Sequence, residues 1–254
     1  MIDEQTLEKL RTMRLHAMAD YVQVMLLKGG STDLSSAEQI GMMVDHEWTA
    51  RDNRRMGLLL KNPKIPANAC VEDIWCEPAR GLDKSVIRSL ATCQWVRAKQ
   101  NVIVVGKTGV GKTFIGASLA QAACRAGFRA LCTRTPRLLH ELAIARADGS
   151  YSALLQRLAK TEVLVLDDFL ITPMKDAERR DLLEVLEDRY DRSATVITSQ
   201  VLTKDWYEMI DDPTVADAIC DRLVHNAHVL SLKGPSIRQR KALKKTEEER
   251  ATTT

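Results

Sequence analysis

One eight-residue motif constrains what this chain can fold into more than any other feature. Residues 106–113 read Gly-Lys-Thr-Gly-Val-Gly-Lys-Thr and match the pattern G-x-x-x-x-G-K-[ST]. The motif follows a continuous apolar run at 102–105, typical of a strand buried on both faces, and precedes a segment with helical spacing. Glycines let the backbone approach a ligand closely, and successive N–H groups at a helix N-terminus bind anions. The motif therefore predicts a phosphate-binding loop between a strand and a helix.

The loop makes specific predictions about a bound nucleotide. We expect Lys112 to reach the β- and γ-phosphates and the Thr113 hydroxyl to ligate Mg²⁺. The remaining positions would bind phosphate oxygens through backbone N–H groups, and they are Gly106, Lys107, Thr108, Gly109, Val110 and Gly111. The cofactors expected on these grounds are ATP and Mg²⁺.

A second apolar run, at 163–166, ends in the two carboxylates Asp167 and Asp168. In open α/β sheets, ligands bind at the carboxyl ends of the parallel strands. We expect Asp167 to hold Mg²⁺, directly or through water, and Asp168 to orient or deprotonate the attacking water. Adjacent acids also occur at ordinary turns after a strand, but the phosphate loop earlier in the chain favours the catalytic interpretation. Together, the two motifs predict a P-loop ATPase.

Three further polar residues are candidates for the catalytic site. Gln200 ends a predicted strand, where its amide would position the water or touch the γ-phosphate. Arg222 lies on the polar side of a late helix, from which it would reach the nucleotide of a neighbouring subunit. Arg238 follows a Gly-Pro-Ser turn and would reach the γ-phosphate from the C-terminal side. The alternatives are an ordinary polar strand end, an exposed arginine paired with acids of its own helix, and a solvated tail charge.

The pattern along the chain divides it into four parts. Residues 1–62 read as a small all-helical domain, rich in methionine, which we expect to need a partner surface such as another copy of itself. Residues 63–81 contain three prolines and read as a linker. Residues 82–235 alternate strand and helix, which predicts a doubly wound parallel five-stranded sheet of the α/β class. Residues 236–254 read as a basic polar tail.

The spacing of apolar residues also predicts the individual elements. Strands are expected at 102–105, 130–133, 163–166, 195–199 and 228–232. Helices are expected at about 83–97, 113–125, 136–146, 150–160 and 176–190, the last with Tyr190 on its buried side, and after the N-cap Asp212. At the N-terminus, we expect one helix that carries Leu7, Leu10, Met18, Tyr21 and Met25 on one face and ends at 29–31. A second helix should run from a capping box at Ser35 and Glu38 to Asn62, with Ile40, Met43, Val44 and Trp48 on its apolar face.

Composition limits the class of protein further. The formal net charge of +3 means that any affinity for nucleic acid must come from local basic patches. The six cysteines form no C-x-x-C pair, which argues against a zinc site or a redox dithiol. The first residues do not have the pattern of a secretory signal, and no apolar run approaches the length of a membrane span. We therefore expect a cytoplasmic protein without membrane contact.

Basic side chains gather in three places: the end of the second helix, the helix after the second strand, and the tail. The middle group comprises Arg134, Arg137 and Arg146. Such clusters are usually solvated faces, but each group is also a candidate for contact with phosphate backbones. Aromatic residues make up 4% of the chain and do not interleave with these groups, so backbone contact with weak sequence preference is favoured over base stacking.

With these motifs in this order, the chain resembles the IstB-like transposition helper ATPases, which are relatives of the DnaC helicase loaders in the AAA+ superfamily. Besides the phosphate loop and the paired acids, the resemblance is carried by residues 47–51, 122–127, 148–151, 180–184, 198–200, 213–228 and 232–238. The block at 213–228 is the most specific to this family. The resemblance extends over nearly the whole chain.

The resemblance implies an ATP-dependent homo-oligomer, with nucleotide at its subunit interfaces, that assembles on duplex DNA and helps an IstA-type transposase engage its target. In the family pattern, Gln200 falls at sensor 1, Arg222 at the arginine finger and Arg238 at sensor 2. The two helices after the second strand resemble an element that faces DNA in related assemblies, which favours Arg134 and Arg137 over the tail. The location implied is the bacterial cytoplasm, on the nucleoid when DNA is bound.

One position departs from the family pattern. An aromatic residue and then glycine usually follow the two acids, whereas here Phe169 is followed by Leu170. A side chain at this point is expected to affect the turn that places the catalytic water, but not Mg²⁺ binding. Two other functions stay open: a helicase loader, and an ATP-gated DNA scaffold with negligible turnover.

Overall fold

The computed structural model describes residues 4–27, 34–60, 65 and 68–237. The chain forms two compact units, Met1–Leu58 and Leu59–Thr254, which are described separately. The predicted boundaries at 62, 81 and 235 stay predictions, and Arg238 and most of the predicted tail lie outside the described residues.

The first unit contains α1 (Glu4–Thr12), α2 (His16–Leu27) and all but the last two residues of α3 (Ser36–Leu60). The prediction of one continuous first helix is wrong, because the chain turns between α1 and α2, where Arg14 has a left-handed φ of 61°. The two helices pack side by side, and the only fully buried side chains described in them are Ala19 and Val22 of α2. The residues expected on one face are only half-buried.

Helix α3 begins with the predicted capping box, since the Ser35 N–H donates to Glu38 at 2.8 Å and the Glu38 N–H donates to the Ser35 hydroxyl at 3.3 Å. Most of its predicted apolar face lies in solvent, since Ile40, Val44 and Trp48 are exposed, Trp48 by 74%, and only Met43 is half-buried. The buried contact is instead polar. Glu47, 6% exposed, accepts a hydrogen bond from the Met18 N–H at 3.0 Å and forms an ion pair with Arg51 at 2.7 Å. This carboxylate fastens α3 to the first turn of α2.

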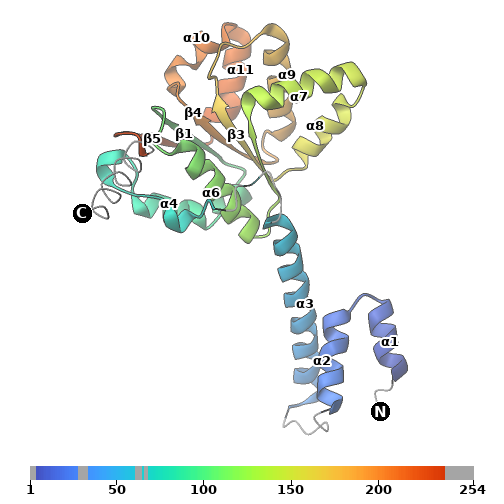
Figure 1. Ribbon diagram of the computed structural model, residues 1–254. Helices are drawn as coiled ribbons and strands as arrows, with labels where there is room; N and C mark the ends of the chain where they lie inside the picture. The colour runs from blue at the N-terminus through green and yellow to red at the C-terminus, as the bar shows by residue number, and fades with distance from the viewer. Residues whose placement is uncertain (1–3, 28–33, 61–64, 66–67, 238–254) are drawn as a thin grey trace, which may run out of the picture. The chain divides into compact units, whose positions relative to one another are not determined.

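The second unit is built on a parallel sheet of five strands, as predicted. The strands are β1 (Asn101–Gly106), β2 (Ala130–Arg134), β3 (Val163–Phe169), β4 (Ala194–Ser199) and β5 (Ala227–Leu232). Their spatial order is β2-β3-β4-β1-β5, and every pairing is parallel. Strand β4 therefore lies between β1, which leads into the phosphate loop, and β3, which ends in the paired acids (Figure 1).

Helices cover both faces of this sheet. One apolar cluster packs α4 (Lys84–Ala91), α5 (Gln94–Arg97) and α6 (Lys112–Arg125) against one face. The other packs α7 (Thr135–Asp148), α8 (Tyr151–Ala159), α9 (Asp176–Arg189), α10 (Trp206–Ile210) and α11 (Pro213–Val224) against the opposite face. Three short 3-10 turns lie among the described residues of this unit: η1 (Val71–Asp73), η2 (Pro78–Arg80) and η3 (Thr203–Asp205). The arrangement is the doubly wound α/β fold that the sequence predicts.

Several local predictions can be checked against these elements. Asp83 caps α4 and Asp212 caps α11, and each side chain accepts a backbone N–H of the first turn. The single helix expected at 83–97 is interrupted, because Cys93 adopts a left-handed φ of 57° between α4 and α5. Tyr190 is 45% exposed rather than buried, because α9 ends one residue earlier and Tyr190 is its C-cap. No helix among the described residues is long and apolar enough to cross a membrane.

Candidate active site

The phosphate loop joins β1 to the N-terminus of α6, as predicted. Gly109 and Gly111 have φ values of 85° and 100°, which side chains rarely adopt, and Gly111 is the N-cap of α6. A Cβ at Gly109 would lie 2.2 Å from the hydroxyl oxygen of Ser236. The loop thus keeps its shape only with glycine at these positions, and it presents a helix N-terminus to an anion.

Two charged or polar side chains of the first turn of α6 face this loop. Lys112 is 7% exposed, and its ammonium group donates to the Lys107 carbonyl at 3.0 Å. The Thr113 hydroxyl donates to Asp167 at 2.9 Å. The second contact joins the two predicted halves of the site across 54 residues of sequence.

Asp167 is held from three directions at the end of β3. Its carboxylate is 8% exposed and accepts hydrogen bonds from Thr113 and from the fully buried hydroxyl of Thr198 on β4. Its backbone carbonyl accepts the Thr135 hydroxyl at 3.1 Å from the start of α7. A buried carboxylate beside a hydroxyl offers the hard oxygen ligands that Mg²⁺ prefers, so these residues fit the predicted metal.

Asp168 leaves the strand in a different direction from Asp167. Its φ is 56°, and the register between β3 and β4 shifts between Leu166 and Phe169. Such an irregularity re-aims a side chain at the end of a strand. The Asp168 carboxylate is 26% exposed and lies 3.7 Å from the guanidinium of Arg134, at the end of β2. The acid thus stands at the rim of the site, within reach of water.

Leu170, the departure from the family pattern, adopts the conformation that a glycine would favour. Its φ is 55°, in the left-handed region, and its side chain is 2% exposed in the apolar cluster under α9 and α10. At this position the left-handed backbone raises the free energy of the folded state, whereas the burial of the apolar side chain lowers it.

Gln200 lies where the sequence places it, at the end of β4 beside the site. Its side-chain oxygen accepts the Thr108 hydroxyl at 2.7 Å, which ties the exposed end of β4 to the phosphate loop. The amide nitrogen is left as the group that can donate to a ligand. Thr108 thereby sets the orientation of the amide.

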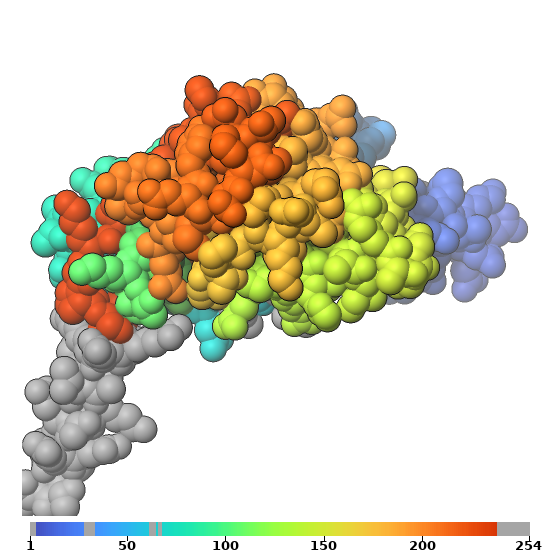
Figure 2. All heavy atoms as spheres, turned by 90° about the horizontal axis from the view of Figure 1, so that it is seen from above, coloured from blue at the N-terminus to red at the C-terminus, as the bar shows by residue number. Residues whose placement is uncertain are grey.

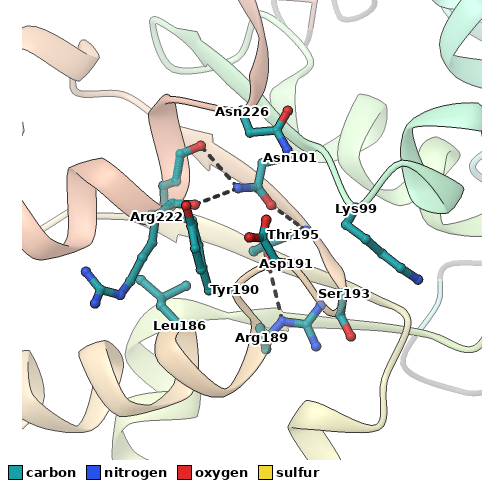
Figure 3. Close-up of a pocket in the computed structure, with 11 residues that line it drawn as sticks. Lys99, Asn101, Leu186, Arg189, Tyr190, Asp191, Ser193, Thr195, Arg222 and Asn226 are labelled. Carbon is teal, nitrogen blue, oxygen red and sulfur yellow. Dashed lines mark hydrogen bonds between the residues drawn. The ribbon is translucent and has the colours of Figure 1, made fainter.

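Within its own chain, Arg222 lies at the amino ends of the strands, on the opposite side of the sheet from the phosphate loop. Asn101, the first residue of β1, donates to the Arg222 carbonyl at 2.9 Å (Figure 3). The phosphate loop lies at the other end of β1, which ends at Gly106. The Arg222 guanidinium is bonded to Glu187 of α9 and to the Ala218 carbonyl at 2.8 Å. Arg222 and the phosphate loop of one chain are therefore not brought together.

The recess in Figure 3 contains a second arginine that the sequence reasoning missed. Arg189 is 1% exposed and donates to the carbonyls of Leu158, Thr161 and Ala194 and to the hydroxyl of Thr195. Burial lowers the pKa of Arg189 to about 9, which leaves the group charged at neutral pH. The recess has a volume of about 10 Å³, room for at most one water, so this arginine joins structural segments rather than binding a ligand.

The three predicted DNA-contacting arginines differ in their surroundings. Arg134 and Arg137 are exposed by 74% and 73%, and they line a groove of about 750 Å³ that also contains Asp167 and Asp168. Arg146 instead pairs with Asp181 at 2.6 Å, and with Glu184 and Tyr151 (its neighbours on α9 and α8). Arg146 thus ties helices together, while the other two point into solvent near the acids.

Thr198 and Thr135 are site residues that the sequence reasoning did not single out. Thr198 belongs to the predicted strand at 195–199, and its hydroxyl donates to the carboxylate of Asp167 on the neighbouring strand. Thr135 follows β2, whose last residue Arg134 is in register with Asp167. Strand order was the missing information in both cases, because it decides which strand ends are neighbours.

The parallel sheet, the glycine loop and the Thr113–Asp167 contact define a P-loop nucleotide-binding protein of the AAA+ fold. The chain belongs to the family of IstB-like ATP-binding proteins, whose model matches residues 8–245. The predicted resemblance is thereby confirmed.

Individual relatives agree with this assignment. The chain is 41% identical over 239 residues to an insertion sequence ATP-binding protein of Sinorhizobium fredii, covering 94% of this chain and 98% of that protein. It is 32% identical over 229 residues to the IS21 ATP-binding protein of Pseudomonas aeruginosa, covering 90% and 86%. Among solved structures, the DnaC helicase loader matches with a TM-score of 0.54 and 19% identity, over 65% of this chain and 97% of that one. This last likeness concerns the fold alone.

Proposed function

We propose that this protein is an ATPase that assembles on duplex DNA and assists an IstA-type transposase in selecting target DNA. The observation that carries the enzymatic part is the contact between Thr113 and Asp167, with Asp168 beside it at the rim. Membership of the IstB-like family and relatives named after insertion sequences support the transposition part.

The site suggests a role for each side chain in hydrolysis. Lys112 would exchange the Lys107 carbonyl for the phosphates of ATP, and the loop N–H groups would hold them. Thr113 and Asp167 would hold Mg²⁺, which supplies charge neutralisation at the phosphates when bound. Asp168 would accept a hydrogen bond from the attacking water, and the Gln200 amide, oriented by Thr108, would position that water or donate to the γ-phosphate.

Oligomeric assembly is needed to complete this site. Arg222 lies at the far edge of its own sheet, so it would act as an arginine finger only on the nucleotide of a neighbouring subunit. Arg238, proposed as sensor 2, lies outside the described residues. A homo-oligomer with nucleotide at its interfaces is therefore part of the proposal.

The first experiment measures ATP turnover of the wild type and the Asp168→Ala variant, with and without duplex DNA. We expect DNA to stimulate the wild type, and the variant to bind ATP and DNA without turnover. If the wild type binds both ligands but hydrolyses ATP no faster than the variant, the protein is an ATP-gated scaffold instead.

A second experiment tests the DNA surface. Arg137→Ala should weaken DNA binding and reduce its dependence on salt by about one counterion, while ATP affinity is unchanged. Arg88→Ala, an exposed arginine on α4, serves as the matched control. Unchanged DNA affinity and salt slope in the Arg137 variant would remove α7 from the DNA interface.

The partner separates the proposed function from that of a helicase loader. The two functions share the same chemistry at the nucleotide, so the site does not distinguish them. Binding of the purified transposase from the same insertion sequence, and not of a replicative helicase, is the expected result. The opposite preference would favour the loader.

A further inference from the structure

The phosphate loop is held from its outer side by a side chain outside the loop motif. Arg80, at the end of η2, is 4% exposed, and its guanidinium donates to the Val110 carbonyl at 2.7 Å. A second nitrogen donates to the Trp75 carbonyl, and the guanidinium lies 4.3 Å from the centre of the Trp75 ring. A buried charged group thus reaches the middle of the loop from 30 residues earlier in the chain.

The contact fixes the direction of a loop N–H group. A peptide bond is planar and trans, so the Val110 carbonyl and the Gly111 N–H point in opposite directions. With the carbonyl held by Arg80, the Gly111 N–H points away from Arg80. This is the N–H of the N-cap of α6, where the helix dipole is positive.

The preceding peptide is held in the same way. The Ile237 N–H donates to the Gly109 carbonyl at 2.9 Å, which directs the Val110 N–H away from the C-terminal segment. The Lys233 N–H in turn donates to the Arg80 carbonyl at 2.8 Å. In Figure 2 the last described residues, in red, lie against the green phosphate loop. Two successive carbonyls of the loop therefore have partners on the outer side, and Arg80 joins the segments that supply them.

These contacts reduce the conformational freedom of the glycine-rich loop before a ligand binds. Glycine loses more conformational freedom than other residues when it is ordered, so a loose loop would bind phosphate at an entropic cost. Outer contacts that order the loop beforehand reduce that cost and raise affinity. The buried guanidinium also places a positive charge one peptide away from the N–H groups that face the phosphates.

We propose that Arg80 is a positioning residue for nucleotide binding, which holds the Val110–Gly111 peptide in the orientation that presents its N–H to the phosphates. The inference rests on the proposed ATP site at this loop. It predicts an effect on affinity for both ATP and ADP, because the oriented N–H serves phosphates that the two nucleotides share.

The main test is Arg80→Met, which removes the donors but keeps an apolar stem to pack on Trp75. With Mg²⁺ present, we expect the dissociation constants of ATP and ADP to rise about 10- to 100-fold, the effect of losing a charged hydrogen bond. At saturating ATP, turnover should stay within a few-fold of the wild type, because uniform binding affects KM and not kcat. Amide exchange at Gly111 should accelerate.

Three further variants make the result decisive. Arg80→Lys restores a cation without the planar fork, and its affinities should fall between those of the wild type and the Met variant. Arg88→Ala controls for the loss of an exposed arginine from the same unit and should change affinity by less than about twofold. Lys112→Ala should abolish nucleotide binding, which establishes the site itself.

All affinities are measured at a temperature where circular dichroism shows the variant to be folded. Wild-type affinities in a folded Met variant, even with a lowered melting temperature, would show that Arg80 only supports the fold and would overturn the inference. A loss of kcat with unchanged affinity would also overturn it. If the Met variant does not fold, the Lys variant decides, and unchanged affinity for both nucleotides counts against the role. A wild type that binds no nucleotide would overturn the proposed function as well.

Discussion

Leu170 offers a direct measurement of the backbone strain beside the catalytic acid. Its side chain is 2% exposed and its φ is 55°. Leu170→Ala removes the buried side chain and retains the strained backbone, so it should destabilise the protein by about 2.7–5.0 kcal/mol. Leu170→Gly removes the same side chain but also relieves about 1–2 kcal/mol of left-handed strain. Because glycine adds about 0.5–1 kcal/mol of unfolded-state entropy, the Gly variant should be more stable than the Ala variant by about 0.5–1 kcal/mol.

The assay is urea unfolding of the nucleotide-free protein, followed by circular dichroism and by the fluorescence of the chain's four tryptophans, among them Trp206. That side chain is fully buried and lies 4.8 Å from the Phe169 ring, between centroids, so it reports on this part of the core. With an m-value of about 2 kcal/mol/M, the Gly variant should unfold at a urea concentration about 0.25–0.5 M higher than the Ala variant.

Gly127 provides the matched control. It has a φ of 85°, and a Cβ added there meets nothing within 4 Å, so Gly127→Ala measures the conformational term alone. We expect it to destabilise by about the same 0.5–1 kcal/mol. If Gly127→Ala behaves in this way but Leu170→Gly is no more stable than Leu170→Ala, then Leu170 is not strained and the argument is wrong.

Three other predictions concern single side chains. Burial of Glu47 raises its pKa, but the hydrogen bonds from Met18 and Arg51 lower it by more, so the pKa lies below the usual 4.5. The helical unit should therefore lose stability as the pH falls through the lowered pKa, and Glu47→Gln should reduce its melting temperature at neutral pH by about 5 °C and flatten that pH dependence. Thr198→Val should raise the Mg²⁺ concentration needed for half-maximal turnover by about 10- to 100-fold, as is usual when a partner of a metal ligand is removed, and an unchanged Mg²⁺ titration would contradict this. Arg189→Met should lower the free energy of unfolding by about 3 kcal/mol or more without changing ATP affinity, since buried carbonyls lose their donor, and urea unfolding with nucleotide titration checks both parts.

The sequence predicted the sheet and the two nucleotide motifs because each depends on local patterns. A fully apolar strand such as 163–166 and a glycine loop before a helix specify their conformations without distant partners. Strand register and order brought Thr113 to Asp167 as expected, since the carboxyl ends of parallel strands share one edge.

The failures share a different cause, which is that they depend on contacts between distant segments. The break at Arg14 and the break at Cys93 are left-handed residues with no local marker, because neither is glycine or asparagine. The role of Thr198 follows only from the placement of β4 beside β3. Arg80 looks like one more surface charge in the sequence, and its burial depends on the fold of the segments at 75–82 and 232–237.

The position of β4 has a consequence for how the protein is made. The strands that carry the two halves of the nucleotide site, β1 and β3, are not neighbours, and β4 separates them. During synthesis, β1 and β3 both leave the ribosome before β4, whose first residue is Ala194. Until then, no strand holds the loop and the acids in register, and the open edges of β1 and β3 are exposed to wrong pairing. A nascent chain therefore gains its ability to bind nucleotide late, in the same step that joins β3 to β1.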